Sequence, residues 1–102
     1  MTALFIGEVE VADENRHDYE NVFLTQANKE LADAGAKHIA GGFDNAVSLV
    51  GIPPKNRYVV IQFDNMDTLQ KWWKGPAGAF VRENMKKYAV GIRMIAANGV
   101  QE

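Results

Sequence analysis

The 102-residue chain contains no cysteine. This absence excludes disulfides, thiolate nucleophiles and metal or iron–sulfur centres held by cysteine. Long apolar runs are missing as well, since the N-terminal run over residues 3–6 is far too short for a membrane span and lacks the basic start of a signal peptide. The sequence therefore predicts a cytoplasmic protein with no membrane partner.

An excess of charge of one sign is also missing, because 11 Lys and Arg stand against 13 Asp and Glu. A net charge of -2 provides no broad attraction for a phosphate backbone, so we expect no nucleic-acid partner. The two histidines, His17 and His38, fall in separate predicted elements without ligand spacing. The glycine-rich stretches lack phosphate-loop and dinucleotide fingerprints. We predict neither a metal site nor a cofactor.

Enough apolar material is present for one hydrophobic core, since 47% of the residues are hydrophobic. The length fits a single domain over residues 1–102 and leaves no room for a second. A domain of this size buries only about two thirds of the surface that its unfolded chain exposes. A second subunit would supplement that burial.

Strand and helix signals alternate along the chain. Residues 57–63 are rich in β-branched and aromatic residues and are predicted to form a central strand. The segments with strand character are residues 3–11, 36–41, 57–63 and 91–97, with a further extended piece over residues 46–50. Helices are expected from an Asp13 cap to Gly35, with an apolar stripe that includes Val22, from an Asn65 cap to Gly75, and from Pro76 to about Tyr88.

This order, β-α-β-β-α-β, predicts an α+β ferredoxin-like fold with an antiparallel sheet. Both helical regions cover one face of such a sheet. Nothing in the chain covers the other face, so apolar residues there need a partner subunit, and the sequence favours a homodimer.

The stretches AGAKHIAGG (residues 34–42) and RYVVIQFDNMDTLQKWWKGPAG (residues 57–78) resemble the domain-of-unknown-function family 1330. The resemblance extends over nearly the whole chain and implies a dimeric α+β barrel, with a small-molecule-sized space between sheet and helices in each subunit. Members commonly carry an Arg before the paired glycines and an acidic residue in the following strand. This chain has Ala40 and Gln62 at those positions.

Three residues with chemically versatile side chains are pocket candidates. His38 is the histidine in a predicted strand, with small neighbours Ala36 and Ala40, and an imidazole can transfer protons near neutral pH. A hydrogen-bonded structural histidine is the alternative. Trp72 and Trp73 are adjacent and must point about 100° apart on a helix, so one belongs to the core and the other walls a pocket or meets the partner.

Polar residues also interrupt the apolar faces of three predicted strands. Glu8 shares a face with Leu4 and Ile6, and the other polar residues of this kind are Tyr58, Gln62 and Arg93. If these faces coincide, they place a few polar groups in an apolar setting on the open side of the sheet. Such a surface is typical of a ligand site or of a polar dimer interface.

Two functional hypotheses follow. The first is a dimeric small-molecule-binding domain, extending to a cofactor-independent enzyme of proton-transfer or oxygenase type, with His38, Tyr58 and Trp73 in its pocket. The second is a non-catalytic interaction module whose dimer surface is its function. A concave pocket that contains His38 favours the first, and a filled core favours the second.

Overall fold

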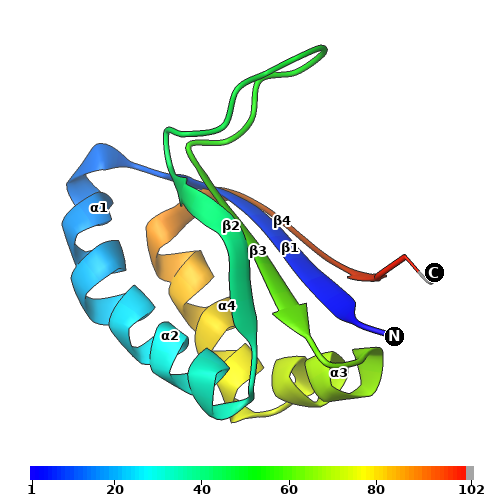
Figure 1. Ribbon diagram of the computed structural model, residues 1–102. Helices are drawn as coiled ribbons and strands as arrows, with labels where there is room; N and C mark the ends of the chain where they lie inside the picture. The colour runs from blue at the N-terminus through cyan, green and yellow to red at the C-terminus, as the bar shows by residue number, and fades with distance from the viewer. Residues whose placement is uncertain (101–102) are drawn as a thin grey trace.

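In the computed structural model, which describes residues 1–100, four strands form one antiparallel sheet. They are β1 (Ala3–Val11), β2 (Lys37–Phe43), β3 (Arg57–Phe63) and β4 (Ala89–Asn98), in the spatial order β2-β3-β1-β4 (Figure 1). The apolar strand β3 lies inside the sheet, as its composition predicts. The α+β ferredoxin-like order of elements is confirmed.

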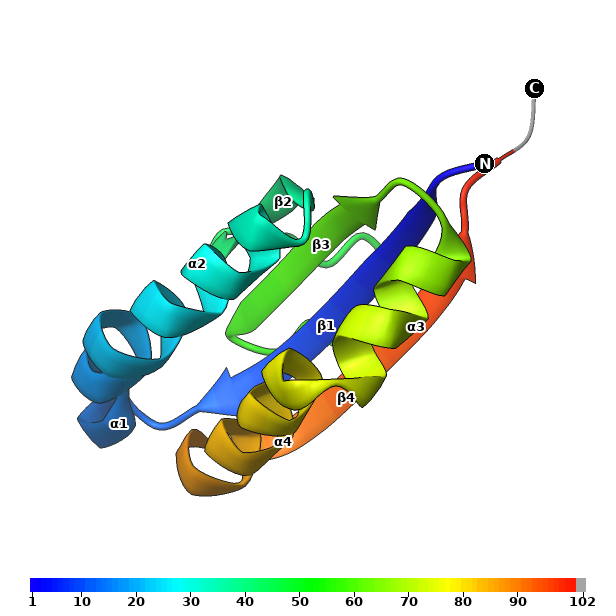
Figure 2. The same ribbon diagram turned by 90° about the horizontal axis from the view of Figure 1, so that it is seen from below.

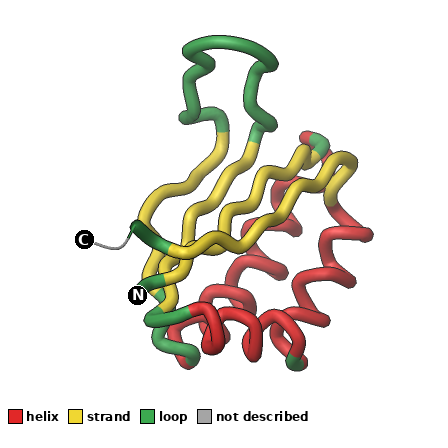
Figure 3. Tube along the Cα trace, turned by 90° about the vertical axis from the view of Figure 1, so that its right-hand side faces the viewer, coloured by secondary structure: helices red, strands yellow, loops and turns green. Residues whose placement is uncertain are grey.

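The helices all lie on one face of this sheet (Figure 2). They are α1 (Asp13–Asp18), the π-helical turn η1 (Tyr19–Phe23), α2 (Leu24–Asp33), α3 (Met66–Lys74) and α4 (Pro76–Tyr88). No helix lies on the opposite face within residues 1–100, so this face, called the open face below, is the outside of a two-layer molecule (Figure 3). None of the helices described is both long and apolar enough to cross a bilayer.

Most of the predicted helix boundaries are confirmed. Gly35, at a φ of 75°, follows the end of α2, and the Asn65 side chain accepts a hydrogen bond of 2.8 Å from the Thr68 amide at the start of α3. Pro76 is the first residue of α4. The predicted Asp13 cap is wrong: Ala12 takes the cap position, and Asp13 lies in the first turn, where its charge suits the positive end of the helix.

The extended piece predicted over residues 46–50 is not a strand. Residues 44–56 form a projecting loop, called the arm, which begins at Asp44 with a positive φ of 55° (Figures 1 and 3). The arm is fastened at its base, where the Asn56 side chain pairs with both the N–H and the C=O of Val11 at 3.0 and 2.7 Å. Residues 46–50 pair with none of the strands of the described sheet, which consists of β2, β3, β1 and β4.

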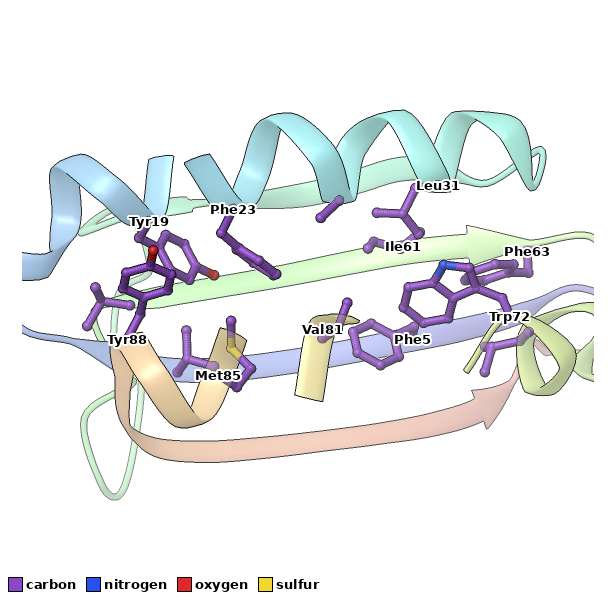
Figure 4. Packing of buried hydrophobic residues seen from close by; sticks show 14 of the residues in the cluster. Phe5, Tyr19, Phe23, Leu31, Ile61, Phe63, Trp72, Val81, Met85 and Tyr88 are labelled. Carbon is purple, nitrogen blue, oxygen red and sulfur yellow. The ribbon is translucent and has the colours of Figure 1, made fainter. Parts of the chain in front are cut away.

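The core lies between the sheet and the helices. Alternate residues of β1 and β3 point into it, among them Phe5 and Phe63, whose rings both lie 5.3 Å from the Trp72 ring (Figure 4). Tyr19, Phe23, Ala27 and Leu31 form the predicted helical stripe and are buried. Val22 was expected in that stripe but is exposed, because the wider π turn rotates it toward solvent.

Candidate ligand site

An apolar cavity of about 50 Å³ remains between the helices and the sheet. Its walls come from β1, β3, η1, α2 and α4, and include Phe5, Phe23, Ala27, Ile61, Val81 and Met85. A buried apolar cavity of about 150 Å³ accommodates benzene, so this smaller one has room for a short alkyl group.

One end of the cavity is polar and opens to solvent. Asn28, His38 and Arg57 line the cavity and also line an open hollow of about 470 Å³ between α2 and β2. These three residues therefore form the mouth through which the apolar interior meets water. A ligand placed here would have an apolar end inside and a polar end at the mouth.

A β-bulge in β2 determines where His38 points. His38 pairs with Ile61, whereas Ala40 pairs with Val60, which leaves Ile39 as the extra residue. His38 therefore faces the helices, and Ala40 faces the opposite side of the sheet. The expectation that Ala36 and Ala40 both flank His38 on one face is wrong for Ala40, because the bulge reverses the alternation between them.

His38 is exposed at the mouth of the cavity, where its surroundings disfavour the charged imidazole. Partial burial of the ring lowers the pKa of His38 below its usual 6.5, and the positive charge of Arg57 lowers this pKa further. A neutral imidazole has one nitrogen free to accept a proton or a hydrogen bond. His38 can therefore act as a base toward a ligand at pH 7.

We predict that the His38 imidazole titrates with a midpoint below 6.5, and that Arg57→Gln raises this midpoint. The unfolded chain then binds the His38 proton more tightly than the native state does, so stability decreases as the pH falls from 7 through the pKa of His38. Proton NMR of the ring across the pH range measures the midpoint. A ring that never titrates, together with a marked loss of stability in His38→Gln, would assign His38 a purely structural role.

Arg57 is the unbalanced charge of the mouth. Its Nε atom is buried and has no hydrogen-bond partner, and no carboxylate of residues 1–100 forms an ion pair with it. Arg16 makes the contrast clear, because its guanidinium lies over the same Phe43 ring and is paired with Asp44 at 2.9 Å and Glu20 at 3.3 Å. The mouth thus carries a positive charge that the described part of the chain leaves unneutralised.

The Tyr19 phenol completes the polar end of the cavity. Burial raises the pKa of Tyr19, and the neighbouring Arg57 guanidinium acts against that rise. Tyr19, Asn28 and Arg57 were not among the residues selected from sequence. Arg57 had a signal: it lies in register with Val59, Ile61 and Phe63, which places a cation on the core-facing side of β3.

The tryptophan pair is divided between two environments. Trp72 is buried, lines the cavity, and has an Nε1–H with no partner, directed toward the interior in Figure 4. Trp73 is half-buried beneath the Arg82 guanidinium, 4.9 Å from the ring centre, and lines a separate hollow with Gln70 and Ile95. The core tryptophan, rather than Trp73, contacts the cavity.

The remaining sequence candidates lie together on the open face. Glu8 lies opposite Tyr58 of β3 and Arg93 of β4 in the sheet. Its carboxylate forms an ion pair with the Arg93 guanidinium, with 3.1 Å between Oε2 and Nη2. Gln62 lies opposite Leu4 on the same face. The thickness of the sheet therefore separates these four residues from His38 and Trp72, so the structure divides the seven candidates between two surfaces.

Comparison with known proteins identifies the family. Residues 2–100 match the family described as Domain of unknown function (DUF1330). The chain belongs to this family. Among proteins of curated function, none matches the sequence of this DUF1330 chain.

Solved structures share the fold of this DUF1330 chain at low sequence identity. A dimeric protein of unknown function and ferredoxin-like fold from Bacteroides fragilis has a TM-score of 0.64 at 13% identity, covering 96% of each chain. A candidate antibiotic biosynthesis monooxygenase from Deinococcus radiodurans has a TM-score of 0.71 at 10% identity, covering 100% of this chain and 95% of that one.

A third similar structure is the heme-degrader MhuD from Mycobacterium tuberculosis, which was solved with two hemes bound in its active site. Its TM-score is 0.60 at 17% identity, covering 98% of this chain and 97% of that one. Likeness at these identities shows a common fold for the DUF1330 chain and these proteins.

Proposed function

We propose that this DUF1330 chain is a small-molecule-binding protein whose ligand enters the cavity between the helices and the sheet. The observation that carries this proposal is an apolar cavity that ends in polar groups at Arg57, His38 and Asn28, which is how ligand sites are commonly built. An interaction module without a ligand would be expected to fill this space with side chains. The ligand-bearing structure of similar fold, MhuD with its hemes, supports a small-molecule role.

Pentanol is a suitable neutral probe for the cavity, because Met85 and Met94 line it and their methyl groups report on its occupancy. We expect saturable shifts of these methyl signals in NMR titrations. Ala27→Leu fills the cavity from α2 and should weaken pentanol binding at least about tenfold, whereas Ala32→Leu, on the outer hollow, should not. Circular dichroism checks that both variants fold. Methyl signals that never respond would reject the cavity as a ligand site.

Proton transfer, alone or as the first step of a cofactor-independent oxygenation, is the reaction that we propose for a bound substrate. The supporting observation is that His38 and the Arg57 guanidinium line the same mouth, where burial and the charge of Arg57 lower the pKa of His38. In this arrangement His38 accepts a proton from the ligand, and Arg57 stabilises the anion that remains. The chemistry requires the free-base imidazole at pH 7, so a His38 midpoint above 7 would argue against it.

We also propose that the protein is a homodimer joined through the open face. This face carries Leu4, Ile6, Val60, Ile95 and Ala97 around the Glu8–Arg93 ion pair. An apolar surface with a small polar centre fits a self-complementary interface better than it fits solvent. The dimeric protein of similar fold from Bacteroides fragilis supports this assignment.

The arm supports the same conclusion. Its side chains Val47, Leu49, Val50 and Ile52 are each more than 80% exposed, and no charged residue lies between Asp44 and Lys55. Its base crosses to the open face, where the Lys55 N–H donates to the Glu8 carboxylate at 3.5 Å. The arm is thus continuous with the open face, and both apolar surfaces would be covered by one second copy.

A further inference from the structure

We infer that the ligand of this cavity is a slender organic acid whose carboxylate pairs with the Arg57 guanidinium while its alkyl end occupies the apolar interior. This inference rests on the proposed ligand site and adds the chemical class of the ligand. Three features of the site lead to it: the unbalanced charge, the kind of unpartnered polar atom on the walls, and the dimensions of the space.

The unbalanced charge calls for an anion. The Nε of Arg57 is removed from water, and no ion pair or hydrogen bond within residues 1–100 compensates that atom. A cation in such a place is costly unless an anion accompanies it. The guanidinium presents donors in a planar fork, and a carboxylate matches this fork with two parallel hydrogen bonds.

The unpartnered polar atoms of the walls are both donors. Besides Arg57 Nε, the buried Trp72 Nε1–H lines the cavity without an acceptor. Neither group can accept a hydrogen bond, so neither favours a donor on the ligand. The acceptors of the inferred acid serve Arg57, because Trp72 packs against Phe63 at the other end of β3, where the alkyl end would lie. When neutral, His38 at the mouth also has one ring nitrogen that can accept a hydrogen bond from the O–H of a protonated carboxylic acid. An amine would meet Arg57 with a charge of the same sign.

The dimensions limit the apolar part of the ligand. The enclosed space of about 50 Å³ suits a short alkyl chain, and the open hollow of about 470 Å³ at the mouth leaves room for the carboxylate and its water. Asn28, His38 and Arg57 belong to both spaces, so the chain and the carboxylate of one molecule can occupy them at the same time.

Pentanoate, pentanol and pentylamine share one alkyl chain and differ in the end group, so together they test the inference. Titrations followed on the Met85 and Met94 methyl signals give a dissociation constant for each probe. In the unmodified protein pentanoate should bind at least about tenfold more tightly than pentanol, as expected for a hydrogen bond to a charged group. Pentylamine should bind more weakly than either.

Arg57→Gln should remove the preference for pentanoate, because it removes the cation. Pentanol carries no charge and should still bind, which shows that the cavity is intact. Lys29→Gln makes the same change of charge on the exposed side of α2 and should preserve the preference. Equal binding of acid and alcohol, or a preference that survives Arg57→Gln, would overturn the inference while leaving the ligand site in place. Failure of all three probes would reject the ligand site itself.

Discussion

Phe63→Ala is expected to lower the free energy of unfolding by about 3–5 kcal/mol, because it removes a large aromatic ring from a site with little freedom to collapse. Phe63 is 1% exposed, and its ring lies 5.3 Å from that of Trp72. The backbone of β3 is held by a neighbouring strand on each side and cannot close the space. Denaturant unfolding at one fixed protein concentration measures the loss, since dimer stability depends on concentration.

Val22→Ala is the control for this measurement, because Val22 is 57% exposed on the outer side of η1 and its truncation should cost less than about 1 kcal/mol. A similarly small loss for Phe63→Ala would contradict the assignment of the core-facing side of β3.

Ile95→Arg is expected to convert the proposed dimer to a monomer at micromolar concentration. Ile95 pairs with Ile6 in the middle of the open face and is 45% exposed in the single chain, so arginine fits there without disturbing the core. In a dimer that buries about 1,200 Å² or more in total through this face, each copy would bring an unpaired arginine into the desolvated interface. Light scattering coupled to size exclusion measures the mass directly.

Val22→Arg adds the same charge on the helical side of the molecule and should remain dimeric. An unmodified protein that is monomeric and well ordered at these concentrations would disprove the open face as a dimer interface. A dimer that survives Ile95→Arg would place the interface elsewhere.

The fold follows closely from local sequence patterns. Alternating residues predicted β1, β-branched and aromatic residues predicted β3, and the turn residues Gly35, Asn65 and Pro76 marked the ends of three helices. These signals are reliable because each depends on backbone conformation within a few residues. The π turn at Tyr19 had no such signal, because its sequence is compatible with an ordinary helix and the core determines its geometry.

The arm shows where local patterns are insufficient. Residues 46–50 have the composition of a strand, since β-branched and apolar side chains suit any half-buried extended segment. Composition alone does not determine whether such a segment is buried by its own chain or by another molecule. Within the described residues this segment pairs with no strand, and its apolar side chains are left at the surface.

The histidine of the candidate site was predicted from the sequence, whereas the arginine was not, although its register with the apolar residues of β3 carried a signal. His38 was selected for its chemistry, which is independent of neighbours, and it lies at the mouth of the cavity. Arg57 begins a strand, and a charged residue at such a position is usually solvated. Its place in the core-facing register therefore does not by itself predict a buried cation. The grouping of Tyr19, Asn28 and Arg57 depends on the packing of three elements, which no local pattern encodes.

The alternation of side chains along β3 places neighbouring positions on opposite faces of the sheet, so substitutions at them act on different surfaces. Arg57, Val59 and Ile61 line the cavity, whereas Tyr58, Val60 and Gln62 point to the open face. In the proposed ligand site and the proposed dimer, a single substitution at one of these positions therefore acts on one surface and leaves the other in place. If both proposals hold, a lineage can change its ligand without changing its dimer interface, whereas insertion of one residue within β3 would exchange the two faces and disrupt both surfaces together.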